Sequence, residues 1–299
     1  MSKTYSIESL MKLLRDPSLL PKALRTLRQD LIKQPLYFDR YWYQWRYGEH
    51  GDEFIDKSWD NLIILDAARP DVLYDLESFP ETKTRERTSP GSFSLQFMEE
   101  QFAGRKLHDT VYITANPHVH DVPEGTFHAV INLLDENWDE ELRTVPHDTV
   151  VEKALEASEQ CRDKRLIVHF MQPYYPFIGS KGKRVPAGIA KRVEDDDYHH
   201  PWLEQMWSEG IDPEFLLDSY RENHSIAIDY AKELVNELPG RSVITSDHAN
   251  LIGERGFPFP IRLYGHPRYF PHPALVAVPW VEFDGERRDV TAEPRSIGR

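Results

Sequence analysis

The segment Arg241-Ser242-Val243-Ile244-Thr245-Ser246-Asp247-His248 is an apolar run that ends in an acid and an imidazole. A second run, Trp59-Asp60-Asn61-Leu62-Ile63-Ile64-Leu65, ends in the same way at Asp66. Both have the length and composition of buried strands. Because the carboxyl ends of parallel strands lie at one edge of a sheet, where ligands bind, we expect Asp66, Asp247 and His248 to meet there. Two carboxylates and an imidazole suit Zn²⁺ or Mn²⁺.

Further apolar runs alternate with helical patterns along the chain. Val111–Thr114 and Arg165–Met171 have the character of strands, and residues 70–76, 149–162 and 212–238 that of helices. Strands that alternate with helices predict a parallel sheet covered on both faces. We therefore expect an α/β fold, a three-layer αβα sandwich with a mostly parallel central sheet. It would occupy residues 51–299 and form the catalytic domain.

The first 50 residues differ from the rest in charge and pattern. Residues 1–48 contain nine Lys and Arg against four Asp and Glu, although the whole chain has a net charge of −14. Leucines recur at helical spacing at positions 20, 24, 27 and 31, and an aromatic cluster follows over residues 37–47. We predict two or three short amphipathic helices that form an arm over residues 1–50 and pack on the main domain. The alternative is peripheral contact with a membrane surface, for which basic residues beside aromatics are typical.

Composition narrows the function classes. The acidic net charge disfavours nucleic-acid binding, and the single cysteine, Cys161, excludes an internal disulfide. Without an apolar run of 18 residues or a signal-peptide core, we expect a cytoplasmic protein, membrane-peripheral if the arm binds lipid. A dinucleotide-binding oxidoreductase is disfavoured because no Gly-x-Gly-x-x-Gly follows the first strand. The sequence gives no indication of oligomeric state.

The two acidic strand ends lie in longer motifs. Asp66-Ala67-Ala68-Arg69-Pro70-Asp71 resembles the opening metal-ligand motif of the alkaline phosphatase superfamily, especially its sulfatase-like branch of the haloarchaeal type. Thr245–Glu254 is similar to that branch's later motif, in which Asp-His follows a buried strand and Gly-Glu comes shortly after. The similarity covers residues 56 to about 285. It implies that Asp66, Asp247 and His248 hold one divalent metal ion, which could be Mn, Zn or Ca.

The resemblance also implies a nucleophile at the start of a helix between the two motifs. Ser92 and Ser94 precede the helical pattern of residues 95–102. A hydroxyl at a helix N-terminus gains from the positive end of the helix dipole. The resemblance favours Ser94, because the helix lies at the family's usual distance after it, and Ser92 is the alternative. Either serine would also make a good N-cap without any chemistry.

Three further residues are candidates for substrate binding. Arg69 either contacts an anionic substrate oxygen or pairs with a local acid. Tyr174 stands where many sulfatase-like proteins have a histidine. His266, in Tyr264-Gly265-His266-Pro267, is a candidate substrate-binding group or general acid. His169 lies inside an apolar strand, and we interpret it as a core histidine.

These residues predict a metal-dependent hydrolase or transferase that acts on small-molecule or glycan phosphate esters, less readily on sulfate esters. Ser94 or Ser92 would attack phosphorus at the metal site, and water or an acceptor alcohol would then resolve the phosphoserine. The cysteine motif of a true sulfatase is absent. The alternative is a catalytically degenerate sulfatase-like protein that serves as a binding or scaffold component in polysaccharide or envelope metabolism.

Overall fold

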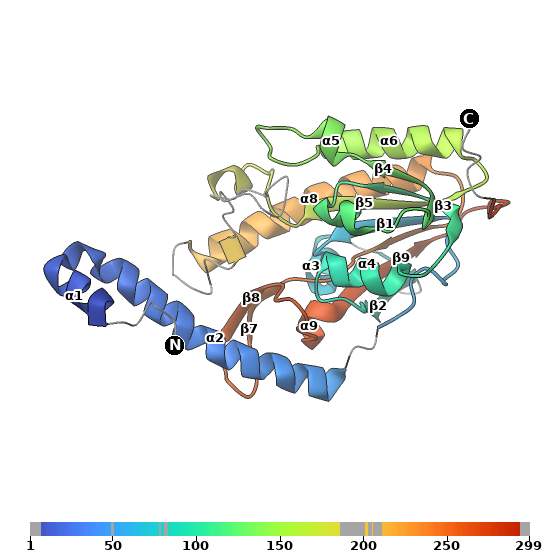
Figure 1. Cartoon of the computed structure of the whole chain (residues 1–299). Coiled ribbons are helices and arrows are strands. Elements are labelled where there is room, and N and C mark those ends of the chain that lie inside the picture. The colour runs from blue at the N-terminus through green and yellow to red at the C-terminus, as the bar shows by residue number, and fades with distance from the viewer. Residues whose placement is uncertain are drawn as a thin grey trace.

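The computed structural model describes residues 7–48, 51–77, 79–80, 83–185, 201–202, 205 and 211–293. Nine strands fall in this part of the chain: β1 (Asn61–Asp66), β2 (Thr84–Thr88), β3 (Leu107–Thr114), β4 (Phe127–Asn132), β5 (Arg165–Pro173), β6 (Ser242–Thr245), β7 (Leu251–Arg255), β8 (Arg262–Gly265) and β9 (Ala277–Phe283). Seven of them form one sheet in the order β2-β9-β6-β1-β5-β3-β4, and β7 pairs with β8 in a separate hairpin (Figure 1).

The sheet is parallel from β6 to β4 and antiparallel at its other edge. β1 pairs in parallel with both β5 and β6, and β3 pairs in parallel with both β4 and β5. All six residues of β1 are buried, which explains its continuous apolar run. β9 runs antiparallel between β2 and β6. This strand is not among those predicted.

Helices cover both faces of the sheet (Figure 1). On one face, α6 (His147–Gln160) packs against α8 (Pro213–Glu237), which also contacts α3 (Pro70–Leu76). On the other face lies α4 (Ser94–Phe102), whose Phe102 ring is 5.5 Å from that of Tyr112 in β3. The short helices α5 (Leu134–Asn137) and α9 (Pro273–Val276) lie in connecting segments. The predicted three-layer αβα sandwich is thus confirmed.

The amino-terminal arm consists of α1 (Ile7–Arg15), a 3₁₀ turn at Pro17–Leu19 and α2 (Leu20–Tyr47). The prediction of two or three short helices is wrong for residues 20–47, which form one helix of 28 residues with Pro35 inside it. Pro35 interrupts the main-chain hydrogen bonds without ending the helix. None of the helices in the described residues is long and apolar enough to cross a bilayer.

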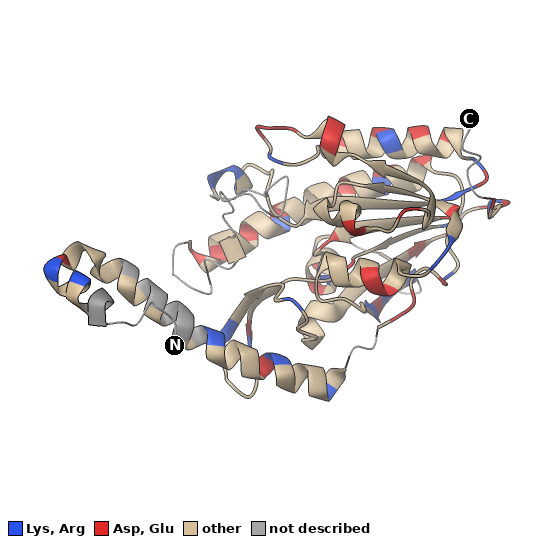
Figure 2. Cartoon of the chain, viewed as in Figure 1, with Lys and Arg blue, Asp and Glu red and all other residues tan. Residues whose placement is uncertain are grey.

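Only part of the arm packs on the domain. In the second half of α2, Asp39 and Tyr43 are buried against the β7–β8 hairpin and the segment after it. The first half of α2 and α1 extend away from the sheet (Figure 1). Figure 2 shows Lys and Arg recurring along the arm, whereas Asp and Glu are frequent on α4, α6 and α8. The division of the chain at residue 50 stays a prediction.

One buried histidine makes the fold sensitive to acid. His147, at the start of α6, stacks on Tyr230 at 5.0 Å, and neither of its ring nitrogens has a hydrogen-bond partner. Burial lowers the pKa of His147 from 6.5 to about 4. Below pH 6.5 this histidine is therefore protonated in the unfolded chain but stays neutral in the folded chain. The folded state loses stability as the pH falls from 6.5 to about 4.

We predict that His147→Phe removes this pH dependence. Phenylalanine keeps the stacking but cannot be protonated. Between pH 7 and pH 5 the free energy of unfolding of the variant should therefore fall by about 2 kcal/mol less than that of the wild type. Urea unfolding at the two pH values measures the difference. His120→Gln, at an exposed histidine, is the control and should behave like the wild type. Equal losses in His147→Phe and wild type would contradict the prediction.

Candidate metal centre

Asp66, Asp247 and His248 converge at the carboxyl edge of the sheet. One ligand atom from each lies within 4.8 Å of the others, and all three residues are buried. His248 Nε2 is 3.7 Å from Asp66 Oδ1 and 3.6 Å from Asp247 Oδ2. Among the described residues this is the one group of acidic, histidine or cysteine side chains placed to hold a metal ion.

The loops after β1 and β6 are tied to each other, which fixes the two acids. Ala67 adopts a left-handed conformation, with φ of 60°, and its N–H donates to Asp247 Oδ1 at 3.3 Å. Ser246 Oγ accepts the N–H of Ala68 at 2.9 Å and lies 2.6 Å from the carbonyl oxygen of Leu65. Because β1 and β6 are neighbours in the sheet, these short bonds hold the carboxylates at a set separation.

The unpaired atoms of this group fit a cation. Asp66 Oδ1 and Asp247 Oδ2 are buried and have no hydrogen-bond partner, which is costly for carboxylates that nothing neutralises. Burial and the neighbouring charge of Asp247 raise the pKa of Asp66. Burial by itself would raise the pKa of Asp247, but His248, His169 and Ser94 together outweigh it and lower that pKa. A divalent ion would remove the repulsion between the two acids.

His248 is oriented as a ligand by its own main chain. Its Nδ1 lies 2.7 Å from the carbonyl oxygen of Ala249, and since a carbonyl only accepts, Nδ1 carries the proton. In the neutral imidazole Nε2 then keeps its lone pair, and that atom faces both carboxylates. Such a bond behind the ring is the usual way in which a metal-binding histidine is held.

Ser94 lies against the centre and Ser92 does not. Ser94 begins α4, and its Oγ is 3.1 Å from Asp66 Oδ2 and 3.4 Å from His248 Nε2. Phe93, the residue before the helix, offers no side-chain acceptor to the first N–H groups, which stay available to an anion. Of the two serines that the sequence left open, the geometry therefore favours Ser94 as the nucleophile.

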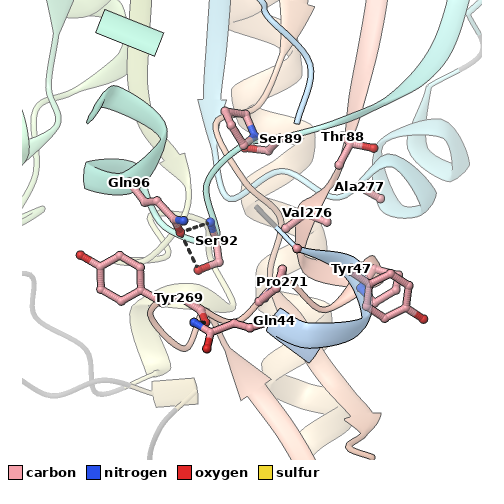
Figure 3. Close-up of a pocket in the computed structure, with 13 residues that line it drawn as sticks. Gln44, Tyr47, Thr88, Ser89, Ser92, Gln96, Tyr269, Pro271, Val276 and Ala277 are labelled. Carbon is pink, nitrogen blue, oxygen red and sulfur yellow. Dashed lines mark hydrogen bonds between the residues drawn. The ribbon is translucent and has the colours of Figure 1, made fainter. Parts of the chain in front are cut away.

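Ser92 belongs to a hollow of about 290 Å³ beside the centre (Figure 3). Its Oγ is 3.2 Å from Gln96 Oε1 and accepts the N–H of Phe270 at 3.1 Å. Gln44 and Tyr47 of α2 form the opposite wall. None of the three candidate metal ligands lines this hollow, so Ser92 holds chain segments together rather than facing the centre.

The Arg69 guanidinium is hydrogen-bonded to two acids of the protein. Its Nε and Nη2 donate to both carboxylate oxygens of Asp71 at 2.8 and 2.7 Å, and Nη1 donates to Glu254 at 2.7 Å and to the carbonyl oxygen of Asn250 at 2.8 Å. Burial alone would lower its pKa, but these acids raise it. The structure shows the pair with local acids that the sequence left open, and the prediction that Arg69 also contacts substrate stays a prediction. The guanidinium ties the loop after β1 to β7.

His266 and Tyr174 lie next to the candidate ligands. The His266 ring is 4.7 Å from that of His248 and 4.8 Å from that of Tyr174. Tyr174 follows β5 directly, and its N–H donates to the carbonyl oxygen of Asp66 at 3.0 Å. The structure thus places both predicted substrate residues at the rim of the centre.

His169 was missed as part of this site. Its Nε2 faces the two acids, 3.6 Å from Asp247 Oδ2 and 4.0 Å from Asp66 Oδ2, and has no hydrogen-bond partner. Its Nδ1 lies 2.9 Å from the hydroxyl of Tyr112. The sequence carried no signal of this, because only the register of the sheet places His169 opposite Ile64, two residues before Asp66. A buried position within β5 therefore lies beside the candidate metal ligands.

Comparisons with known proteins were made on this basis. No protein-family model and no curated protein matches the chain. Among solved structures it is similar to the integral membrane protein lipooligosaccharide phosphoethanolamine transferase A (EptA) from Neisseria meningitidis, at 13% identity and a TM-score of 0.49. That match covers 77% of this chain and 49% of the other, so the chain spans about half the length of EptA.

Two further solved structures are similar to the chain. One is the C-terminal periplasmic domain of EcEptC from Escherichia coli in complex with Zn, with 14% identity, a TM-score of 0.42 and coverage of 80% and 76%. The other is a protein in the alkaline phosphatase superfamily from Vibrio parahaemolyticus, with 11% identity, a TM-score of 0.39 and coverage of 78% and 62%. The superfamily that the sequence motifs resemble is thus found among the structural neighbours. At these TM-scores, function is inferred from the residues of this chain alone.

The expectation of a cytoplasmic location has no support in these comparisons. One neighbour is an integral membrane protein and another is a periplasmic domain. Acidic composition and the lack of a long apolar run do not specify a compartment.

We predict that Asp247→Asn changes stability in opposite directions with and without metal. An amide removes the repulsion between the two buried acids, so the metal-free variant should unfold at about 1–3 kcal/mol higher free energy than the wild type. Zn²⁺ or Mn²⁺ at about 100 times the wild-type dissociation constant should add about 2.7 kcal/mol to the wild type and little to the variant. Thermal and urea unfolding with and without each metal measure both effects.

Asp60→Asn is a matched control for this experiment. Asp60 is also buried, but it lies at the amino end of β1, where its Oδ2 accepts the N–H of Arg241 at 2.8 Å. This variant should keep the full response to metal. A normal metal response in Asp247→Asn would remove Asp247 from the ligand set.

We also predict that His169→Phe weakens metal binding by about 10- to 100-fold, because an imidazole that faces both acids is lost. Tyr112→Phe, which removes only the hydroxyl behind His169, should have a smaller effect. Isothermal titration with Zn²⁺ compares the two variants with the wild type. Unchanged affinity in His169→Phe would restore the interpretation of His169 as a core residue.

Proposed function

We propose that this protein is a metal-dependent enzyme that transfers or hydrolyses phosphate esters through Ser94. One observation carries the proposal: a helix-starting hydroxyl lies in contact with a group of two buried acids and an imidazole. Ser94 Oγ reaches Asp66 Oδ2 at 3.1 Å and His248 Nε2 at 3.4 Å. Neither the hydroxyl nor the metal-type ligand set alone would suggest this chemistry.

Each side chain of the centre has a role in this proposal. Asp66, Asp247 and His248 hold the ion, with His169 beside them. A bound Zn²⁺ or Mn²⁺ would supply Lewis-acid stabilisation of negative charge on the phosphoryl oxygens. The E. coli neighbour is described in complex with Zn. Two carboxylates and an imidazole, as in this chain, are also suitable ligands for zinc.

The reaction proceeds in two displacements. Ser94 Oγ attacks phosphorus while its proton passes to Asp66 Oδ2, and the bond from phosphorus to the leaving oxygen breaks. His266 donates a proton to that oxygen, and the first N–H groups of α4 receive the phosphoryl oxygens. His266 then takes a proton from water or an acceptor hydroxyl as that oxygen attacks the phosphoserine. The bond from phosphorus to Ser94 Oγ breaks, and Asp66 returns its proton to Ser94, which releases the new phosphate product. Both acceptors are compatible with the residues of the centre.

The position of Tyr174 suits a role in holding substrate. Its ring stands beside His266 at the rim of the centre, and a phenol donates a hydrogen bond to an oxyanion readily. We propose phosphate rather than sulfate esters, because the nucleophile is a serine and the cysteine motif of sulfatases is absent.

The competing proposal is a degenerate protein that serves as a binding or scaffold component. Tyr174, where many sulfatase-like proteins have histidine, favours it. Metal content separates the two proposals: a stoichiometric divalent ion in the purified chain supports the enzyme. A chain that binds no Zn²⁺, Mn²⁺ or Ca²⁺ supports the scaffold.

We predict that Ser94→Ala lowers metal-dependent hydrolysis of an aryl phosphate by at least about 1000-fold, because the nucleophile is lost. Wild-type protein quenched during turnover should carry a phosphate on Ser94, found by peptide mass spectrometry. Ser92→Ala is the matched control, since this serine lies two residues away and faces the hollow. It should retain turnover within about tenfold.

Turnover of the two serine variants and the position of the phosphate together identify the role of each serine. Equal loss in both serine variants would indicate a structural effect, and phosphate on Ser92 would transfer the role to that residue. Full turnover in Ser94→Ala would refute nucleophilic catalysis by Ser94. Because sulfate and phosphate aryl esters can be run in parallel, the same assay also tests the choice of ester.

A further inference from the structure

An apolar strip runs along the exposed side of α2. Leu20, Leu24, Leu27 and Leu31 recur at intervals of three and four residues and are all exposed, Leu31 by 65%. This spacing puts them on one side of the helix. Phe38 and Trp45 continue the strip at positions 38 and 45, each seven residues or about two helical turns after the previous member, and Trp45 is 80% exposed. Large side chains of this kind are uncommon on a free protein surface in such a continuous row.

A second segment adds aromatic rings to the same surface. Phe257 and Phe259 lie in the loop between β7 and β8, and both are exposed. Phe257 packs 4.5 Å from Trp42, and Phe259 packs 5.9 Å from Phe38. Two segments more than 200 residues apart in the chain thus present aromatic side chains side by side.

A buried acid fixes that loop to the helix. Asp39 is fully buried, and its Oδ1 accepts the N–H of Phe259 at 2.9 Å. Gly256 makes the close approach possible, because a Cβ there would lie 2.0 Å from Asp39 Oδ2. The aromatic loop is therefore held beside α2 by the fold rather than by the exposed rings themselves.

Positive charge accompanies these apolar residues. Residues 1–48 hold nine Lys and Arg against four Asp and Glu, while the whole chain has a net charge of −14 (Figure 2). Arg40 and Arg46 lie over the rings of Tyr37 and Tyr47 at 5.0 and 5.2 Å. Arg255, which ends β7, is exposed close to the aromatic loop in the sequence.

We infer that this surface, made of the α2 strip and the loop aromatics Phe257 and Phe259, docks on an anionic lipid bilayer. Trp, Tyr and Phe rings beside Leu favour the interface between headgroups and acyl chains, and neighbouring Lys and Arg are attracted to anionic headgroups. The acidic remainder of the chain would be repelled, so only the arm side can approach. A symmetric pair of chains joined through this surface would instead bring two basic arms together, which disfavours a second copy as the occupant.

The docked helix also reaches the hollow beside the metal centre. Gln44 and Tyr47, near the end of α2, line that hollow together with Ser92 (Figure 3). Lipid binding would therefore hold this hollow close to the membrane surface. The inference on docking stands on the surface itself and does not depend on the proposed reaction.

Vesicle flotation of the full chain tests the inference. The vesicles contain phosphatidylcholine alone or equal parts of phosphatidylcholine and phosphatidylglycerol, at low and high salt. The wild type should float with the mixed vesicles, less so at high salt because ions screen the headgroups. Two double variants, Trp45→Ser with Phe257→Ser and Leu27→Ser with Leu31→Ser, should each bind at least about tenfold more weakly.

Matched controls and the oligomeric state complete the test. Leu76→Ser and Val130→Ser remove apolar side chains of 41% and 43% exposure elsewhere on the molecule and should float like the wild type. Failure of the wild type to float, or equal binding to both kinds of vesicle, would overturn the inference. So would a dimer in sedimentation that the double variants abolish without any binding to lipid. Turnover of a soluble aryl phosphate by each variant shows separately whether the centre is intact.

Discussion

Two carboxylates buried within a few ångströms of each other are the constraint on which the rest of this structure depends. Asp66 is the last residue of β1 and Asp247 lies two residues after the neighbouring β6, and hydrogen bonds of Ala67 and Ser246 hold the two loops together. Like charges in such a place are unfavourable unless a cation or a proton lies between them. The surrounding residues respond to this constraint: His248 and His169 direct ring nitrogens at the acids, and Asn116 and Ser94 donate to Asp66.

The cluster around Arg69 differs from the metal centre in that its charges are paired within the protein. Arg69 has acids on two sides, Asp71 and Glu254, together with a carbonyl oxygen, so its charge is neutralised within the protein. The guanidinium joins the loop after β1 to β7. The two clusters therefore differ in function because one is complete without a partner and the other has unpaired buried atoms.

The arm shows a similar contrast between its two ends. Near the domain, Asp39 and Tyr43 are buried and fasten α2 to the β7–β8 hairpin. Farther out, the leucines of α2 have no cover among the described residues. A helix with an apolar side is stable in water only when something covers that side. This explains why the leucine spacing predicted helix correctly but did not specify what the helix packs against.

The sequence by itself determined the central strands, the flanking helices and the candidate metal ligands, because buried parallel strands leave continuous apolar runs and their carboxyl ends must share an edge. It did not determine β9, since a strand interrupted by Pro279 lacks that signal, or the role of His169, which has the pattern of a core residue until the register of β5 against β1 is known. The contact of Ser94 with Asp66, the pairing of Arg69 and the contact of Phe38 with Phe259 are seen only in the tertiary structure. Each depends on which atoms face one another across long stretches of chain, and the local spacing of residues carries no information about that.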